Sequence, residues 1–412
     1  MERRDFVAVG LSGALAGGVD WSPFGKPGPV QDQVRARFPR LRAETFVNAA
    51  AGTPLGAFAE SGIQRYAAYQ RLGPGDGRAD YINQVMSDVR ASFGNLIGAR
   101  TSEIALVHCT KAGEQIVLDG LDPGRRGRNV VTNDMHFTGS LHNLIGLRRS
   151  GVDVRIVRGR DWNVSLDDMS RAIDDETALV AVTLVSNITG RIEPMRELAD
   201  IAHARGALVY ADIIQAAGIL PVDVRALGID FAAANGYKWL YGVHGAGFLF
   251  VRDDLQGSAL PDRVFPGNVA YNYPPWVSEP DPDGDPLVYE PRTDARRYEP
   301  GHASYLGYCA VYEGMEFLRR VTPDLAHQHT VSLNQRLIEQ VDETRYELLP
   351  RDVRSPIVTY RRRDGRALAE RLAAARVTVS LLGSGRDLVR ISPAIYNTAA
   401  DVDRVTEVLN GL

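Results

Sequence analysis

The chain places a carboxylate and an amine after two successive apolar runs, and this pairing constrains its fold more than any other feature. The run that starts at residue 207 has the length of a buried strand and delivers Asp212 at its carboxyl end. The next run, Phe231–Ala234, leads within a few residues to Lys238. Residues 207–252 therefore predict two successive strands that bring a carboxylate and an ammonium group into one site.

Lysine is rare in this chain, which makes Lys238 a specific candidate for amine chemistry. Only three of the 47 basic residues are lysines, namely Lys26, Lys111 and Lys238. Arginine cannot lose its proton and form an imine, whereas a desolvated lysine can. Because Lys26 lies in a Gly- and Pro-rich segment and Lys111 precedes a predicted helix, Lys238 is the best Schiff-base candidate.

Strands and helices alternate along the middle of the chain, which predicts an open α/β sheet. Residues 178–186 are continuously apolar, as in a buried parallel strand, and end at Asn187. A helix predicted over 193–205 returns the chain to the strand that carries Asp212. Polar residues at the carboxyl ends of strands are typical of a ligand site at that sheet edge. With 412 residues and 44% apolar content, the chain can form a large and a smaller domain.

A second strand-to-helix junction has the features of an anion site. A strand leads into Thr110, and a helix is predicted to begin around 112–114 with the small residues Ala112 and Gly113 in its first turn. Free N–H groups and the positive end of the helix dipole favour a phosphate there. The alternative is an ordinary helix cap formed by Thr110.

Together these motifs resemble the class V aminotransferase branch of the fold type I pyridoxal-phosphate enzymes. This branch includes cysteine desulfurases, isopenicillin N epimerase-like proteins and kynureninases. The family pattern of Asp, Gln and an aromatic residue directly before Lys is matched by Asp212, Gln215, Tyr237 and Lys238. The resemblance runs from about residue 45 to the end. It implies a large domain with a mainly parallel seven-stranded sheet, a smaller α+β C-terminal domain, pyridoxal 5'-phosphate as cofactor and a homodimer with sites near its interface.

The resemblance also implies roles for residues around the cofactor. Lys238 would hold it as an aldimine and then move the α-proton, and Asp212 would keep the pyridine nitrogen protonated. Phe137 would stack on the ring, with His136 as the second choice. The implied catalytic residues are thus Lys238, Asp212 and Phe137. The other implied cofactor ligands are Thr110, Ala112 and Gly113 at the phosphate, Ile214 beneath the ring, Gln215 and Asn187 at its oxygen, and Asn235 and Tyr237 where many members have Ser and His.

Arg390 is the residue that the resemblance assigns to the substrate. It lies in Arg390-Ile391-Ser392, which with the later Tyr-Asn-Thr matches a family motif, and would pair with an α-carboxylate through two hydrogen bonds. The alternative is a surface ion pair. His136, which could exchange protons, and Asn48, in the segment expected to approach the substrate, are further substrate-site candidates.

The predicted reaction is of the aminotransferase or epimerase type, on an amino acid or an amino-acid-derived metabolite. The alternatives are a C–S or C–C lyase, suggested by Tyr237, and, from another class, a non-catalytic cofactor-binding protein. Cysteine desulfuration is not expected, since residues 342–389, where a desulfurase carries its nucleophilic cysteine, contain none.

Five segments are predicted along the chain. They are a possible twin-arginine leader at 1–19, an N-terminal arm at 20–60 that is predicted to be extended over 20–45, a large cofactor-binding domain at 61–262, a long loop at 263–298 and a small C-terminal domain at 299–412. The leader contains Arg3-Arg4 and a short apolar stretch, so the protein is either exported by the twin-arginine route or cytoplasmic with a vestigial leader. The loop carries Tyr271, Tyr273 and Trp276, available for a site or a dimer contact.

Composition argues against other classes of partner. A net charge of −4 gives no general attraction to nucleic acid. Two cysteines 200 residues apart and eight scattered histidines do not have the spacing of a metal site, so no metal is expected. Beyond the leader, which is itself too short to span a bilayer, no stretch has the pattern of a membrane segment.

Overall fold

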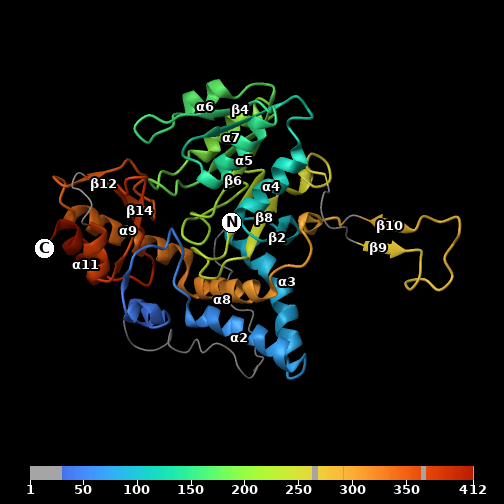
Figure 1. Cartoon of the computed structure of the whole chain (residues 1–412), viewed down its shortest axis with the longest axis horizontal. Helices are drawn as coiled ribbons and strands as arrows, with labels where there is room; N and C mark the ends of the chain where they lie inside the picture. The colour runs from blue at the N-terminus through green and yellow to red at the C-terminus, as the bar shows by residue number, and fades with distance from the viewer. Residues whose placement is uncertain (1–29, 262–267, 291, 363–367, 412) are drawn as a thin grey trace, which may run out of the picture.

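A seven-stranded mixed sheet forms the centre of the molecule (Figure 1). The computed structural model describes residues 30–261, 268–290, 292–362 and 368–411. The strand order is β2-β8-β7-β6-β5-β3-β4, and only β8 runs antiparallel to its neighbours. The strands are β2 (Ile104–Val107), β3 (Asn129–Asn133), β4 (Val154–Val157), β5 (Thr177–Thr183), β6 (Leu208–Asp212), β7 (Phe231–Asn235) and β8 (Gly247–Val251). The predicted mainly parallel sheet is confirmed.

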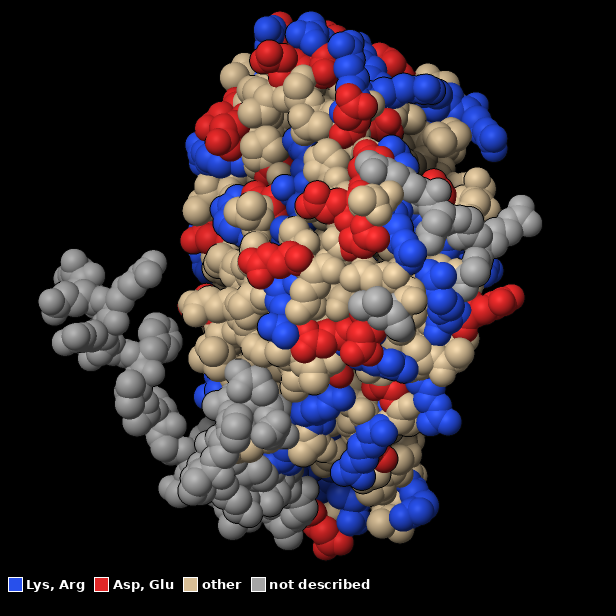
Figure 2. All heavy atoms as spheres, turned by 90° about the vertical axis from the view of Figure 1, so that its left-hand side faces the viewer, with Lys and Arg blue, Asp and Glu red and all other residues tan. Residues whose placement is uncertain are grey.

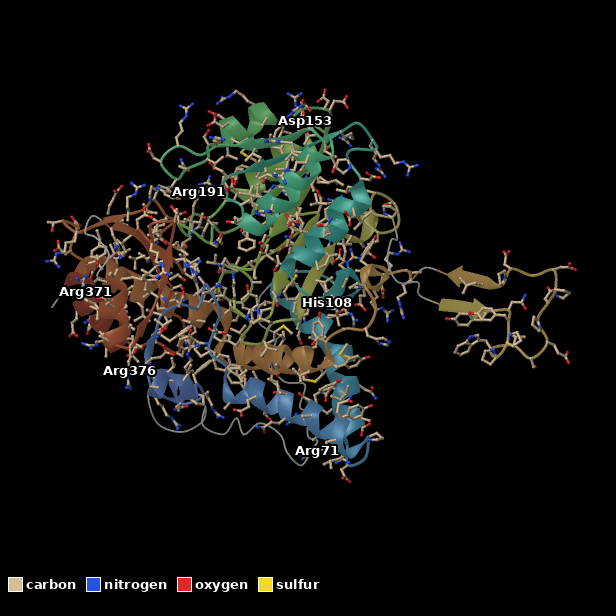
Figure 3. All side chains as sticks on the ribbon, viewed as in Figure 1. Arg71, His108, Asp153, Arg191, Arg371 and Arg376 are labelled. Atoms are coloured by element: carbon tan, nitrogen blue, oxygen red, sulfur yellow. The ribbon has the colours of Figure 1, made fainter. Side chains whose placement is uncertain are left out.

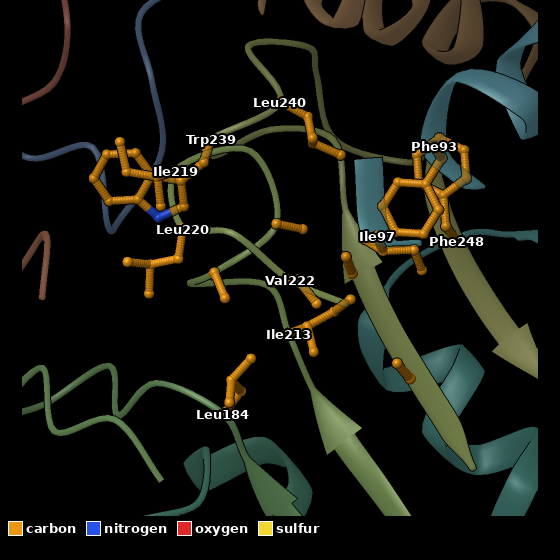
Figure 4. Packing of buried hydrophobic residues seen from close by; sticks show 14 of the residues in the cluster. Phe93, Ile97, Leu184, Ile213, Ile219, Leu220, Val222, Trp239, Leu240 and Phe248 are labelled. Carbon is orange, nitrogen blue, oxygen red and sulfur yellow. The ribbon is translucent and has the colours of Figure 1, made fainter. Parts of the chain in front are cut away.

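Helices cover both faces of this sheet, which explains why its strands are apolar throughout. Alternate residues of β7 belong to two separate cores, Phe231 and Ala233 on one face and Ala232 and Ala234 on the other. The first face is covered by α4 (Thr110–Leu121) and α5 (Thr138–Arg149), and the second by α3 (Arg78–Ile97), α6 (Leu166–Ala172) and α7 (Met195–His203). On the second face the rings of Phe93 and Phe248 stack 4.1 Å apart, and Figure 4 shows this packing.

A smaller α+β unit follows at the C-terminus. Its four-stranded antiparallel sheet has the order β11-β12-β15-β14 and its own apolar core. The strands are β11 (Tyr346–Leu348), β12 (Val358–Arg362), β14 (Ser380–Leu382) and β15 (Leu388–Ile391), and the helices are α9 (Pro323–Gln340), α10 (Leu368–Ala374) and α11 (Ala399–Asn410). The N-terminal β1 (Thr45–Phe46) pairs in parallel with β13 (Val377–Thr378), so the start of the described chain is tied to this unit.

Two predicted segments differ from the structure because tertiary packing orders them. The arm predicted to be extended contains α1 (Val30–Arg35) and the short η2 (Pro39–Arg42), and α2 (Ala57–Leu72) begins before residue 61. Between α1 and η2, Phe38 is buried against the rings of Phe58, Tyr241, Phe317 and Tyr396. Helix α8 (Tyr305–Val321) buries its apolar side in the core beneath the central sheet, so the boundary predicted at 299 does not separate the two units. The remaining short turns are η3 (Thr101–Glu103), η4 (Asp253–Leu255) and η5 (Ala295–Tyr298).

The long loop predicted at 263–298 contains a β-hairpin. Strands β9 (Asn268–Tyr271) and β10 (Leu287–Glu290) pair antiparallel, and the hairpin projects from the body of the molecule (Figures 1 and 3). The strands are too short and the connection too rich in Pro and Asp for a periodic pattern to be visible in the sequence. Tyr271 stacks on Trp276 at 5.0 Å, and Trp276 is 64% exposed.

The surface of the described chain carries both signs of charge. On the face in Figure 2, basic and acidic side chains are interspersed. Within the described residues no helix is long and apolar enough to cross a membrane, and no cluster of three or more His, Cys, Asp or Glu residues could hold a metal ion. The predicted leader and Lys26 lie outside the described residues.

A buried carboxylate at the edge of the sheet opposite Asp212 gives a test of the fold. Asp230 is fully buried, forms an ion pair with Arg252 and accepts from Val209 N–H at 2.8 Å, with His203 Nε2 2.9 Å away. Removing one partner of a buried ion pair costs about 3–5 kcal/mol. Asp230→Asn should lower the free energy of unfolding by about that amount in urea titrations.

Asp254 supplies the matched control for this prediction. It pairs with the same Arg252 at 2.6 Å, but its side chain is 60% exposed. Asp254→Asn should therefore cost less than about 1 kcal/mol. Equal losses of stability in the two variants would contradict the assigned role of Asp230.

Candidate active site

A cavity of about 330 Å³ lies where the strand ends meet the first turn of α4. Asp212 ends β6 and Asn235 ends β7, and both line it, as expected for the carboxyl edge of an open α/β sheet. Its other lining residues are Cys109, Thr110, Lys111, Phe137, Ser140, Ile214, Tyr237, Lys238, His244 and Gly245. A larger cavity of about 620 Å³ between α3 and α8 contains neither the amine nor Asp212. The smaller cavity is therefore the candidate site.

Lys238 presents an amine suited to covalent chemistry. The residue is only 7% exposed and follows β7 in a tight turn. Burial lowers the pKa of Lys238 to about 8; the Asp212 carboxylate acts in the opposite direction, and Arg390 adds to the lowering. At pH 7 roughly a tenth of the amine is thus uncharged, and therefore nucleophilic, which is a far larger share than in an ordinary lysine.

This lowered pKa gives a prediction of pH dependence. The neutral amine is the reactive form, so the rate at which cofactor-free protein attaches pyridoxal phosphate should rise with pH and be half-maximal near pH 8. Stopped-flow absorbance over a range of pH measures this midpoint. Arg390→Met removes a charge that lowers the Lys238 pKa, so the midpoint should move to higher pH. A midpoint near the ordinary lysine value of about 10.4 would contradict the assignment.

Asp212 is a buried carboxylate facing the same cavity. It is 2% exposed, and its Oδ1 accepts from Ile214 N–H at 2.9 Å. Burial raises the pKa of Asp212, while His136 and Lys238 lower it. A carboxylate held in a low-dielectric site strongly favours a cationic N–H partner.

The first turn of α4 has the features of an anion site, although two predicted contributors act differently. The helix begins at Thr110, earlier than predicted, and Thr110 Oγ1 is buried without a partner among the described residues. The N–H groups of Ala112 and Gly113 donate to Cys109 O. A Cβ on Gly113 would come within 2.9 Å of Ala233 Cβ, so this glycine allows the helix to approach the sheet rather than an anion to approach the helix.

Tyr237 and His244 form one wall of the cavity. Their ring centroids are 3.9 Å apart with an interplanar angle of 25°. His244 is not among the residues predicted from the sequence, where its only signal is a histidine within a glycine-rich segment just after Lys238. Asn235 Oδ1 is buried without a partner among the described residues, so it remains available to a ligand.

The two stacking candidates lie at different depths. Phe137 lines the cavity and is 42% exposed, whereas His136 is fully buried, with Nε2 3.3 Å from Glu114 Oε1. Glu114, another residue missed from the sequence, also accepts from Asn143 Nδ2 at 3.2 Å. His136 lowers the pKa of Asp212, so this buried pair acts on the site.

Three expected contacts at the cofactor ring differ in their placement. Ile214 lines the cavity as expected. Gln215 does not line it, because its Nε2 donates to Ala50 O at 2.9 Å and its Oε1 accepts from Trp239 Nε1 at 3.0 Å. Asn187 is engaged through its backbone oxygen, which accepts from Arg390 Nη1 at 2.7 Å. Tertiary contacts therefore already occupy the Gln215 amide, whereas the side-chain amide of Asn187 stays a predicted ring ligand.

Arg390 is a buried cation without an anionic partner. It is 4% exposed and forms no ion pair with any carboxylate that the structure describes, so the predicted alternative of a surface ion pair is wrong. Burial lowers the pKa of Arg390 to about 10, and Tyr237 acts in the opposite direction. Asn48 does not touch Arg390 directly and is joined to it through Ser380.

These features fit pyridoxal phosphate. An amine with a lowered pKa, a buried carboxylate for a pyridine N–H and an unpartnered hydroxyl at a helix N-terminus share one cavity. Fold and site define a pyridoxal-phosphate-dependent enzyme of fold type I.

Comparison with known proteins assigns the family. The model of the family "Aminotransferase class-V" matches residues 63–405. A probable cysteine desulfurase of Methanothermobacter thermautotrophicus is 30% identical over 74% of each chain. The uncharacterized aminotransferase YcbU of Bacillus subtilis is 24% identical over 90% of this chain and 95% of its own. A cysteine desulfurase structure from Thermococcus onnurineus aligns with a TM-score of 0.77 at 21% identity, over 94% and 100% of the two chains, which shows the shared fold. The chain belongs to the class V aminotransferase family.

Proposed function

We propose that this enzyme acts on an α-amino acid, or a metabolite derived from one, in a reaction of the aminotransferase or epimerase type. The observation that carries the proposal is Arg390, a buried guanidinium that forms no ion pair with any carboxylate among the described residues and whose charge adds to the lowering of the Lys238 pKa. A buried cation is stabilised when it is paired, and a substrate α-carboxylate supplies the missing charge. The substrate would then hold its α-carbon near Lys238.

Lys238, Asp212 and Arg390 would each have a separate role in the reaction. The bound cofactor supplies an electron sink conjugated to the substrate α-carbon. Lys238 Nζ takes or returns the proton at that carbon, because its lowered pKa lets it exchange protons near neutral pH. Asp212 holds a proton on the pyridine nitrogen, and Arg390 fixes the orientation of the substrate carboxylate.

The remaining cavity residues would hold the cofactor in place. The Thr110 hydroxyl at the start of α4 suits its phosphate, and Asn235 and Tyr237 line the same cavity. Phe137 is proposed to cover the ring from the open side, and His136, held by Glu114, lies on the buried side near Asp212. Ile214 is proposed as an apolar contact of the ring.

A C–S or C–C lyase is the second candidate, supported by the relatives named cysteine desulfurases. Sulfur transfer to a protein cysteine is not proposed, since residues 342–389 contain no cysteine and Cys309 is buried, which raises its pKa to about 12. Since the chain is an enzyme of this family, the non-catalytic alternative is set aside.

The experiment adds a panel of amino acids to the holoenzyme, with and without a keto acid, while the visible spectrum and the products are followed. Aminotransferase chemistry requires the keto acid, and epimerase chemistry inverts the α-carbon without it. Lyase chemistry releases ammonia, a thiol or a carbon fragment without a keto acid. If no amino acid changes the spectrum and no product forms, the proposal fails.

We further propose a homodimer in which the β9–β10 hairpin contacts the second copy. Its exposed Tyr271–Trp276 stack has the aromatic composition of an interface core. Light scattering would measure the oligomeric state of the wild type and of Trp276→Ala.

Export by the twin-arginine route remains a proposal, with the cytoplasm as its alternative. Cell fractionation of the protein with and without residues 1–19 would decide between them.

A further inference from the structure

Three side chains form a row on one face of the C-terminal sheet. Arg390 on β15 lies opposite Thr359 on β12 and opposite Ser380 on β14. Residues directly opposite in antiparallel strands project from the same face. Two members of this row hold the loop that follows β5: Thr359 Oγ1 donates to Ile188 O at 2.5 Å and Arg390 Nη1 donates to Asn187 O at 2.7 Å.

The Ser380 hydroxyl is oriented by two hydrogen bonds. It donates to Asn48 Oδ1 at 2.8 Å, and it accepts from Arg390 Nη2 at 3.0 Å. A serine hydroxyl has one proton and two lone pairs, so donation to Asn48 leaves its lone pairs for the guanidinium. Asn48 is itself fixed, because it forms a parallel β-bridge with Ser392. The hydrogen bonds from Arg390 to Ser380 and from Ser380 to Asn48 therefore join the C-terminal sheet to the segment near the N-terminus.

These contacts fix the guanidinium at two of its three nitrogens. Arg390 Nη1 and Nη2 are held by Asn187 O and Ser380 Oγ, whereas Nε is buried without a partner among the described residues. Because the group is planar, two fixed nitrogens determine the direction in which the third donates.

We propose that Ser380 is a positioning residue for the substrate carboxylate, which it orients through Arg390 without touching the substrate. This inference rests on the proposed function, in which Arg390 binds an α-carboxylate. Loss of the hydroxyl would leave Nη2 buried without its acceptor and free the guanidinium to rotate about Nη1. Ser380 would then control affinity for the carboxylate while having no part in the chemistry at the α-carbon.

The test compares two probes on the holoenzyme, L-alanine and ethylamine, which differ in the carboxylate. The half-saturating concentration of each is measured from the change in the visible spectrum. Ser380→Ala should raise the value for L-alanine about 10- to 100-fold, the range expected for one lost hydrogen bond to a charged group, and leave ethylamine within about twofold. Ser380→Thr keeps the hydroxyl and should restore the wild-type value for L-alanine.

Two further variants separate positioning from packing. Asn48→Ala should also raise the half-saturating concentration of L-alanine. The double variant Ser380→Ala/Asn48→Ala should have the same half-saturating concentration as Ser380→Ala, because both residues act through one chain of hydrogen bonds. Ser392→Ala is the matched control: its buried Oγ accepts from Ala50 N–H at 2.9 Å and forms no hydrogen bond with Arg390. It should leave the ratio of the two half-saturating concentrations unchanged.

The outcomes distinguish this inference from the proposed function. If the wild type does not prefer L-alanine over ethylamine, Arg390 does not bind a carboxylate and both proposals fail. If the wild type prefers L-alanine and Ser380→Ala keeps that preference, only the positioning role is overturned. An equal loss for both probes would also overturn it, since that result indicates a general structural effect. Equilibrium dialysis of pyridoxal phosphate should give the same affinity in Ser380→Ala and wild type.

Discussion

Lys238→Ala should lower kcat by at least about 10³-fold and remove the visible absorption band of lysine-bound cofactor. The amine is the only described lysine nitrogen that is both buried in the cavity and lowered in pKa. Proton transfer by a positioned base contributes about 10²- to 10⁴-fold, and the covalent attachment is lost as well. Single-turnover kinetics together with the absorption spectrum measure the two losses separately.

Two controls make this prediction specific. Lys238→Arg keeps a cation but cannot lose its proton, so it should be as inactive as the alanine variant. Added ethylamine should restore part of the proton-transfer rate in Lys238→Ala, because a small amine can enter the space left by the side chain. A Lys238→Ala protein with wild-type turnover would show that another group supplies the base.

Asp212→Asn should lower kcat by about 10²- to 10³-fold with little change in fold, the range seen when one stabilising group is removed from an active site. Asparagine keeps the size of the side chain and an oxygen that can accept from Ile214 N–H, so only the negative charge is lost. Without that charge the pyridine nitrogen is no longer held protonated, and the cofactor becomes a weaker electron sink. Circular dichroism and steady-state kinetics on the same preparation check both parts.

Asp134 provides the matched control for Asp212. It follows β3 at the same edge of the sheet and its Oδ1 accepts from Gly159 N–H at 2.9 Å, but it does not line the candidate cavity. Asp134→Asn should therefore leave kcat within about threefold of wild type, since surface changes away from a site have small effects. If both variants lost activity equally, the effect would come from the sheet edge in general and the role of Asp212 would be wrong.

Residues that can be located from the sequence are those whose position depends on local pattern. Asp212 and Lys238 directly follow apolar runs, and the end of a buried strand is visible as a change from apolar to polar residues. Thr110 is placed in the same way, at a strand-to-helix junction. The structure brings these three residues to one cavity because strands of this sheet end at a common edge.

Residues that were missed or placed differently depend on contacts across the chain. Gln215 is separated from its partner Ala50 by 165 positions, and no local pattern reveals that its amide is already used. Gly113 appeared suited to an anion until its packing on Ala233 was known. His244 and Glu114 become candidate site residues only through their contacts in the folded structure. His244 stacks on Tyr237, and Glu114 lies within hydrogen-bond distance of His136.

The sequence by itself determined the mainly parallel sheet and the placement of Asp212 and Lys238 after strands, because strand periodicity and rare residue types are local properties. Its resemblance to the class V aminotransferases implied the family, the cofactor class and the roles open to Asp212, Lys238 and Arg390. Only the tertiary structure decided how those side chains are held: which carboxylate orients His136, which backbone oxygen anchors Arg390, and that Ser380 joins Arg390 to Asn48. The contacts of Arg390 with Asn187 and of Ser380 with Asn48 link residues 203 and 332 positions apart. They arise from the register of the strands and the packing of the two units, which no local pattern specifies.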